Sequence, residues 1–305
     1  MSVIVTRVGI VKDALIRPMR PEDVPVAEEL SLAVYTDAER FEPPNLAPAS
    51  PRHTPARAGQ WITRTSHLLD TDPEGCWVAE VDGELVGFAV SFRRDLLWVL
   101  ASYAVRSGLQ GQGIGRPLLE AALSYSRGCL RAMFASSSDP KAYRVYRRAG
   151  FTLHPELHLS GVPDRSVIPV VEHVRDGTPG DFDLMDSVDR QRRDAAHGPD
   201  HLLLAGMHRL LVVDGSTGSG YAYVHESGAP QLLAASNRRT AARLLWEAIA
   251  SAPPDAPLEI AHVTPANEWA VDIGLEARLA VSTRGYLALR GMRPPTPYLP
   301  HSSLL

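Results

Sequence analysis

The chain has 305 residues, which exceeds what one hydrophobic core usually organises and favours two domains of about 150 residues each. Its hydrophobic share of 45% and charged share of 22% are those of an ordinary globular protein. The formal net charge is −4, and no cluster of Lys or Arg with interleaved aromatic residues is present. This pattern excludes a nucleic-acid partner bound through its phosphates. We expect a small-molecule or peptide substrate instead.

Two properties predict the compartment. No apolar run approaches the ~18 residues that a membrane span needs, and residues 1–7 lack the apolar core of a signal peptide. The chain contains two cysteines, Cys76 and Cys129, too few for a disulfide scaffold or a Cys-based zinc site. We expect both to be buried apolar side chains, and the protein to be cytoplasmic without membrane association.

Hydrophobic periodicity and turn residues divide the first half of the chain into alternating strands and helices. Asp82-Gly83 supplies the positive φ angles of a tight hairpin turn. The proline-rich residues 36–60 have no clean period and predict a long irregular loop or broken helix of the kind that lines a binding cleft. The expected elements are a strand at 16–18, a helix at 23–34, hairpin strands at 76–81 and 85–92, a strand at 96–105, a helix at 116–126, a strand at 130–135, a helix from Asp139-Pro140 to Gly150, and a strand at 151–159.

After a linker at 160–169, the second half repeats this order of elements with few matching residues. The sequence therefore predicts an α/β class, with a mixed sheet in each of two domains, 1–160 and 168–305. The expected elements are a strand at 170–175, a helix at 181–193, hairpin strands at 210–213 and 220–225, a strand at 231–235, a helix at 237–251, a strand at 258–263, and a short helix from 265 that ends at Gly274.

Residues 110–115, Gln-Gly-Gln-Gly-Ile-Gly, form a glycine-rich loop between a strand and a helix. Such a loop presents backbone N–H groups at the positive end of the helix, which suits a phosphate. The dinucleotide fingerprint is excluded because the glycine spacing differs, the loop follows the fourth strand, and the region near Arg131 has no acid. A tight turn that merely allows close packing is the remaining alternative.

Two motifs resemble the GNAT superfamily of N-acetyltransferases. The acyl-CoA loop of that family has the form (Arg/Gln)-x-x-Gly-x-(Gly/Ala), and residues 110–115 fit it in full. Family members then carry Ala-x-x-x-Tyr-x-x-x-Gly-Phe, which stands here from Ala142 through Tyr146 to Gly150-Phe151. The resemblance covers residues 14–159 and is topological over 168–290. The chain thus looks like a tandem GNAT protein with two acyl-CoA N-acyltransferase-like domains.

The resemblance implies acetyl-CoA as co-substrate and no metal. The amides of residues 110–116 would hold the CoA pyrophosphate, and the backbone of residues 102–105 would pair with the pantetheine arm as an added strand. In the family, the fourth strand splays from the fifth, and a backbone N–H near Tyr103 or Ala104 would stabilise the oxyanion. The residues implied in cofactor binding are Ser102, Tyr103, Ala104, Val105, Gln110, Gly111, Gln112, Gly113, Ile114, Gly115, Arg116, Asp139 and Ala142.

Tyr146 matches the family tyrosine that protonates the departing thiolate, which implies that it is catalytic. The alternative is a core tyrosine at helical spacing with Tyr143. Asp139 stands where many members have an Asn that hydrogen-bonds the pantetheine; a carboxylate lacks the amide's donor, and a role as helix N-cap is the alternative.

The general base is not identified by the resemblance, because the fourth strand has no Glu or Asp. Acids in the segment expected to border the acceptor pocket are candidates, with solvated surface charge as the alternative and a water chain as another proton route. His154 and His158, on the terminal strand, are expected to be structural. The candidates in the bordering segment are Glu28, Glu29, Asp37, Glu39, Glu42 and His53.

The second domain lacks an intact counterpart of the glycine loop. The equivalent residues 236–241, Ser-Asn-Arg-Arg-Thr-Ala, contain no glycine, so side chains would obstruct a pyrophosphate, although Arg238 and Arg239 could still attract an anion. No tyrosine stands where Tyr146 stands in the first domain. We expect 1–160 to be the catalytic domain and 168–305 to be a degenerate, structural or substrate-shaping domain.

These observations predict an N-acetyltransferase that moves an acetyl group from acetyl-CoA to a primary amine by direct attack. The missing base and the degenerate second domain motivate an alternative, a non-catalytic acyl-CoA-binding regulatory protein. A third possibility is acylation of protein lysines or N-termini instead of small amines.

Overall fold

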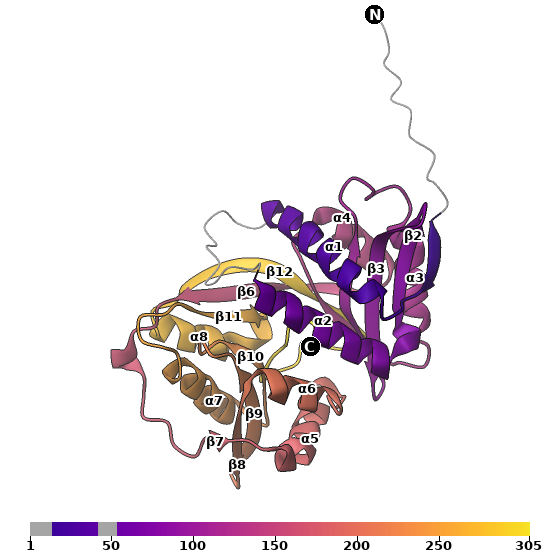
Figure 1. The fold of residues 1–305 in the computed structure, drawn as a ribbon. Helices are drawn as coiled ribbons and strands as arrows, with labels where there is room; N and C mark the ends of the chain where they lie inside the picture. Colours follow the sequence, from indigo (N-terminus) through magenta and orange to yellow (C-terminus); the bar gives the residue numbers. More distant parts are fainter. Residues whose placement is uncertain (1–13, 42–53) are drawn as a thin grey trace, which may run out of the picture.

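The structure, a computed structural model, describes residues 14–41 and 54–305, which form two sheets with helices packed against them (Figure 1). The predicted α/β class is confirmed. We call residues 14–161 the first half and residues 168–305 the second half.

Within the described residues, eight strands form a mixed sheet in the order β1-β2-β3-β4-β5-β12-β6-β11. β4 and β5 are parallel, and the other neighbours are antiparallel. The predicted hairpin is confirmed: Asp82 and Gly83 join β2 to β3 at φ 52° and 82°. The strands are β1 (Leu15–Pro18), β2 (Cys76–Val81), β3 (Glu84–Arg94), β4 (Leu97–Val105), β5 (Arg131–Ser136), β6 (Thr152–Gly161), β11 (Leu258–Val263) and β12 (Ala280–Arg290).

Two strands of this sheet come from the second half. β12 lies between β5 and β6, with Leu289 opposite Met133 on β5 and Leu287 opposite His154 on β6. β11 pairs with the other side of β6. In Figure 1 the yellow β12 runs beside β6 towards the first half. The sheet of the first half is therefore completed by strands from beyond residue 168.

The described residues of the first half form the helices α1 (Asp23–Ala38), α2 (Pro55–Thr71), α3 (Gly115–Ser124) and α4 (Pro140–Arg148). The expected irregular segment at 36–60 is corrected at both ends, because α1 continues to Ala38 and α2 begins at Pro55; residues 42–53 lie outside the described part. The Oγ1 of Thr54 accepts the amide of Arg57 at 3.2 Å, and Pro55 needs no N–H acceptor at this position, so a helix can begin here.

The second half holds an antiparallel sheet in the order β13-β10-β9-β8-β7. The predicted strand at 170–175 is wrong except for its end, since β7 spans only Arg175–Asp176 and the apolar Val170 is 91% exposed on the surface. The predictions missed α2, α6, β12 and β13. The elements are β8 (Arg209–Gly215), β9 (Gly218–Val224), β10 (Pro230–Ala235), β13 (Tyr298–Leu299), α5 (Phe182–Arg193), α6 (Asp200–Met207), α7 (Arg238–Ala250) and α8 (Glu268–Glu276).

A buried salt bridge connects the two halves. Arg94, at the end of β3, donates to Asp200 of α6 at 2.6 and 2.9 Å and to Asp72 at 2.8 Å. Burial alone would raise the pKa of Asp200, but hydrogen bonds from His67 and Arg94 lower it to about 2. The bidentate pair is therefore charged at neutral pH and fixes α6 against the first half.

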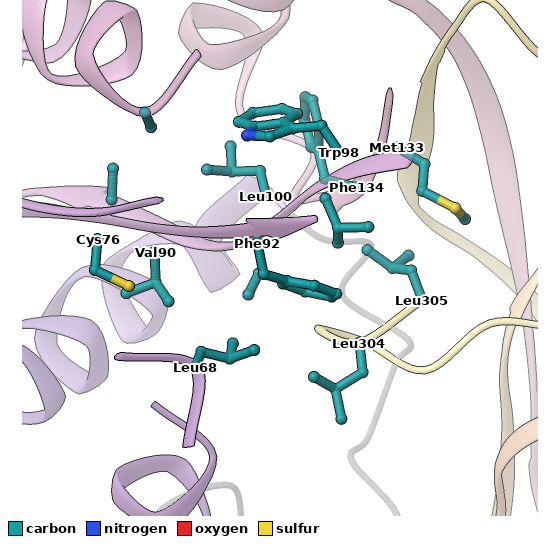
Figure 2. Close-up of a cluster of buried hydrophobic side chains, with 14 of the residues drawn as sticks. Leu68, Cys76, Val90, Phe92, Trp98, Leu100, Met133, Phe134, Leu304 and Leu305 are labelled. Atoms are coloured by element: carbon teal, nitrogen blue, oxygen red, sulfur yellow. The ribbon is translucent and has the colours of Figure 1, made fainter. Parts of the chain in front are cut away.

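The last residues of the sequence pack into the core of the first half. Leu304 and Leu305 are buried beside Phe92 (Figure 2). The buried guanidinium of Arg193, on α5, donates to the carbonyl of Leu304 at 3.0 Å and also to that of Leu305. The chain end thus connects the second sheet to the first core. Across residues 14–41 and 54–305, no helix is long and apolar enough to cross a membrane.

The position of β12 predicts that its buried side chains stabilise both halves. Leu287→Ala, at a fully buried position, should lower the free energy of unfolding by about 2–5 kcal/mol, measured by urea denaturation. Val281→Thr on the same strand, where Val281 is 42% exposed, is the matched control and should cost less than about 1 kcal/mol. Equal losses for the two variants would contradict the central role of β12.

Candidate active site

β4 and β5 separate at the centre of the first sheet. They pair only from Leu97 opposite Arg131 to Val99 opposite Met133, whereas β4 continues to Val105. The register of β4 also shifts against β3 at this point, between Leu100 and Ser102, which is a β-bulge. Beyond Val99, one edge of β4 therefore has no strand of the described chain beside it, and the splay expected from the family resemblance is present.

A cleft of about 2000 Å³ opens along this free edge and extends to the second half. It is larger than the ~300–1,000 Å³ of a typical single-ligand pocket, so it has room for two reactants. Its lining includes residues of α1, α2, β4 and α4, and also residues of β6 and β11 and residues 300–304. Most of the predicted site residues line it: Ser102, Tyr103, Ala104, Val105, Gln110, Gly111, Gly113, Gly115, Arg116, Asp139, Ala142 and Tyr146.

The glycine loop lies at the end of β4 and leads into α3. Gly111 and Gly113 have φ of 79° and 93°, in the left-handed region that favours glycine, and a Cβ at Gly111 would face open space. The side chain of Gln110 donates to the carbonyl of Val105 at 3.1 Å, and that of Gln112 donates to Gly108 at 2.8 Å. The loop is held from within, and its glycine backbone faces outward.

The first turn of α3 is open to an anion. The N-cap residue, Ile114, is buried and provides no side-chain cap, and Pro117 in the first turn has no N–H. Within the described chain, the amides of residues 113–116 donate no hydrogen bond to a protein acceptor. Arg116 is exposed and pairs with Glu120 at 2.8 Å. Free amides at a helix N-terminus are a ready phosphate site.

Gly115 is required for close packing. The phenol of Tyr103, on β4, donates to the Gly115 carbonyl at 2.8 Å. A Cβ at Gly115 would lie 2.5 Å from that phenol oxygen. The contact fixes the distance between the free edge of β4 and the first turn of α3. The hydroxyl of Ser102, next along β4, lies 3.4 Å from that of Tyr35 across the cleft.

Tyr146 lies on α4 with its ring packed against Phe134 of β5, with ring centroids 4.5 Å apart. The side chain is 6% exposed and lines the cleft, and within the described chain its phenol makes no hydrogen bond. Burial, with smaller contributions from Tyr103, Tyr35 and Asp139, raises the pKa of Tyr146 well above its usual value. The phenol is therefore protonated at neutral pH and free to donate to a ligand.

Asp139 is the N-cap of α4. Its carboxylate accepts the amide of Lys141 at 2.8 Å, and Pro140 follows as the first helical residue. Ala142, one turn before Tyr146, lines the cleft. The carboxylate of Asp139 thus has a structural role as the helix cap. Asp139 also lines the cleft, and its contact with a cofactor stays a prediction.

The acids of the bordering segment do not converge on one point. Glu28 and Asp37 line the cleft from α1, whereas Glu29 is exposed and outside the cleft lining. Glu42 and His53 lie outside the described residues. The backbone of Glu39 begins a short 3₁₀ turn.

The structure brings a different set of titratable side chains to the cleft, from β6 and β11. The Nδ1 of His262, on β11, lies 2.8 Å from Oε2 of Glu156, on β6. The Nδ1 of His158 lies 2.6 Å from Glu259, one pair beside the other. His154, by contrast, bonds Thr152 away from the cleft lining. Sequence reasoning missed Glu156, Glu259 and His262, because no local motif marks them and strand pairing brings them together.

A second cluster lies buried in the second half. Among the described residues, Asp189, His197 and His201 form the group whose potential metal-ligand atoms all lie within 4.8 Å of one another. Asp189 is already satisfied by His197 at 2.7 Å and by the phenol of Tyr221 at 2.6 Å. Asp186 joins the cluster, 3.2 Å from His201. None of these residues lines the cleft. These bonds hold α5 and α6 against β9, whereas Nε2 of His197 and Nε2 of His201 are buried without a hydrogen-bond partner in the described chain.

In the second half, the edge of β10 that corresponds to the free edge of β4 is covered by another strand, β13. β10 corresponds to β4 in element order, and β13 pairs with it, Leu233 opposite Leu299 and Ala234 opposite Tyr298. The helix that follows, α7, is capped by Asn237, whose side chain accepts the amide of Thr240 at 3.0 Å. Both features that open the first half are thus closed in the second.

Comparison with known proteins gives a family match over part of the chain. A model of the acetyltransferase (GNAT) family matches residues 24–151. The chain is 36% identical over 88 residues to mycothiol acetyltransferase of Streptomyces avermitilis, covering 27% of this chain and 29% of that protein. It is 38% identical over 66 residues to an uncharacterized N-acetyltransferase of Archaeoglobus fulgidus, covering 19% and 45%. The matches therefore span less than half of these relatives.

Solved structures match the fold over nearly the whole chain. A protein from Pyrococcus horikoshii gives a TM-score of 0.71 at 17% identity and covers 98% of both chains. A GCN5-related N-acetyltransferase from Sphaerobacter thermophilus gives 0.58 at 15% identity, covering 94% of this chain and 98% of that one. A tandem GNAT protein from the clavulanic acid biosynthesis pathway gives 0.54 at 14% identity, covering 92% and 99%. The predicted tandem GNAT fold is confirmed.

The contact between Gly115 and Tyr103 predicts the effect of one added methyl group. Gly115→Ala should weaken acetyl-CoA binding at least about tenfold, equivalent to 1.4 kcal/mol, because the Cβ displaces Tyr103 and the first turn of α3. Titration calorimetry measures this. Gly59→Ala, in exposed helix with no atom within 4 Å of the new Cβ, is the control and should bind normally. Equal affinities in both variants would contradict the assignment of the loop.

Proposed function

We propose that the protein transfers an acetyl group from acetyl-CoA to a primary amine in the cleft, because a model of the acetyltransferase (GNAT) family matches residues 24–151. The observation that carries the proposal is the arrangement of three features around the cleft. β4 has a free edge, the glycine loop after β4 leads into a helix without a side-chain cap, and Tyr146 lines the same cleft. The reaction is direct attack of the amine on the thioester carbonyl.

The donor occupies the splay between β4 and β5. The amides of residues 110–116 hold the pyrophosphate at the N-terminus of α3, where the helix dipole favours negative charge. The pantetheine arm pairs with the backbone of residues 102–105 as an added strand. This extended geometry directs the thioester along β4 into the part of the cleft that borders Tyr35 and Tyr146.

Charge develops on two atoms during the reaction. A backbone N–H near Tyr103 or Ala104 stabilises the oxyanion of the tetrahedral intermediate. Tyr146 gives its phenol proton to the departing thiolate, a role that its protonated state at neutral pH and its lack of a hydrogen-bond partner in the described chain support. The catalytic assignment of Tyr146 and the cofactor contacts are parts of this proposal.

The second half serves as a structural and substrate-shaping domain. Two observations support this: β13 occupies the edge of β10 that a pantetheine arm would need, and Asn237 caps the helix that would meet the pyrophosphate. Residues 300–304 and β11 from this half line the acceptor side of the cleft.

The activity is tested by the release of free thiol from acetyl-CoA in the presence of a panel of primary amines, including a lysine-containing peptide. Mass detection of the acetylated product identifies the acceptor. We expect thiol release that depends on the amine. Binding of acetyl-CoA with no thiol release from any amine would instead support the alternative of a non-catalytic acyl-CoA-binding regulatory protein.

The role of Tyr146 predicts a separation of turnover from binding. Tyr146→Phe should lower kcat by about 10²–10⁴-fold, the usual contribution of a general acid, while acetyl-CoA affinity stays within about threefold. Tyr143→Phe is the matched control, because Tyr143 lies on the same helix outside the cleft lining and should keep full turnover. Unchanged kcat in Tyr146→Phe would mean that the tyrosine only packs the core.

A further inference from the structure

The proposed acetyl transfer needs a group that removes a proton from the acceptor ammonium, and β4 offers no acid or histidine for this. The strands β6 and β11, which also line the cleft, do. His262 lines the cleft from β11, and its side chain is 20% exposed. Its Nδ1 lies 2.8 Å from Oε2 of Glu156. Its Nε2 makes no hydrogen bond within the described chain and is not among the buried atoms, so it is accessible to solvent. The Nε2 therefore faces the cleft.

Glu156 fixes the state of that imidazole. The carboxylate is 1% exposed, so its charge is stable only if a partner compensates it. A carboxylate accepts, so Nδ1 of His262 carries the proton, and the lone pair lies on Nε2 towards the cleft. A buried carboxylate that holds the tautomer and the orientation of an imidazole also stabilises the imidazolium when it forms.

The backbone is distorted on both sides of Glu156. The register of β11 shifts between Ile260 and Val263, and His262 has φ 57°, which is sparsely populated for a residue with a Cβ. The register of β12 shifts between Thr283 and Tyr286. Glu156 lies on the strand between these two bulges. Strain of this kind persists only where the surrounding structure enforces it, and it concentrates at functional sites.

An unsatisfied polar pocket lies next to the pair. Within the described residues, Oε1 of Glu156 and Oγ of Ser136 are buried without a hydrogen-bond partner, and both residues line the cleft. Gly285 joins them: a Cβ there would collide with the Ser136 carbonyl and lie 3.8 Å from Oε2 of Glu156. Buried polar atoms without partners are uncommon and mark a place where a polar ligand group or water belongs.

We propose that His262 is the general base of the reaction, that its Nε2 takes a proton from the acceptor ammonium, and that Glu156 is its positioning residue. This inference rests on the proposed function. The second half thereby supplies a group that touches the substrate, which goes beyond the role of shaping the cleft.

Nε2 of His262 takes one proton from R–NH₃⁺, and the resulting amine forms a bond to the thioester carbonyl carbon. Collapse of the tetrahedral intermediate breaks the C–S bond, and Tyr146 protonates the thiolate. The nitrogen gives its second proton to the Tyr146 phenolate, and the imidazolium releases its proton to water. The products are the acetamide, the free thiol and one proton.

The groups that face His262 determine its pH dependence. Burial disfavours the imidazolium, but the carboxylates of Glu156 and Glu259 outweigh it, so the pKa of His262 is raised above its usual value. His158 touches the ring at 5.7 Å between centroids, and Arg284 of β12 lies 3.8 Å from Glu259. His301, on the chain end, is a poorer base, because its Nδ1 already accepts the amides of Ser303 and Leu304 and burial lowers its pKa well below the usual value.

The test uses His262→Gly, because glycine suits φ 57° and the fold should survive the change. With the best amine of the panel, kcat/KM should fall about 10²–10⁴-fold, acetyl-CoA affinity should stay unchanged, and added imidazole should restore part of the rate. His173→Gln, at a side chain that is 75% exposed, is the control and should match the unmodified protein.

Glu156→Gln separates positioning from mere support of the fold. Removing the carboxylate destabilises the imidazolium and lowers the pKa of His262, so the acid limb of kcat/KM should move to lower pH and its plateau should fall. A rate in His262→Gly equal to that of the unmodified protein, or an acid limb in Glu156→Gln that does not move, overturns the inference alone. An unmodified protein that releases no thiol with any amine overturns the proposed function, and the inference with it.

Discussion

The insertion of β12 between β5 and β6 is the constraint on which the rest of the structure depends. It makes the sheet of the first half continuous with the second half, and β11 joins the same sheet through β6. The buried bridge of Arg94 with Asp200 and the packing of Leu304 and Leu305 beside Phe92 connect the halves at further points. A cleft between the halves can therefore have fixed walls instead of a hinge-dependent shape.

The two halves have a similar order of elements, but one leaves backbone groups open to a ligand and the other closes them. In the first half, β4 loses its neighbour after Val99, and α3 begins without a side-chain cap, so backbone donors and acceptors are exposed to the cleft. In the second half, β13 takes the place beside β10, and Asn237 caps α7. Backbone groups that are satisfied by the protein cannot bind a ligand, so the contrast explains why one half is suited to a donor and the other to packing.

The sequence predicted what is encoded locally. The glycine loop, the Asp82-Gly83 turn and the Asp139 cap depend on a few adjacent residues, and the structure contains each of them. Glu156 and His262 are 106 positions apart, and they meet only because β6 and β11 are neighbours with a bulge at the meeting point. The prediction of a strand at 170–175 was wrong for a related reason: residues 170–174 pair with no strand of the described chain. Nonlocal pairing of this kind leaves no local pattern.

We propose that the chain has one donor site, in the first half, and none in the second. Titration calorimetry of the full chain with acetyl-CoA tests this most directly, because the stoichiometry does not depend on the acceptor. We expect one acetyl-CoA bound per chain. Two equivalents per chain would contradict it, since the edge of β10 and the N-terminus of α7 would then accept a cofactor despite β13 and Asn237, and no binding would remove the donor site altogether.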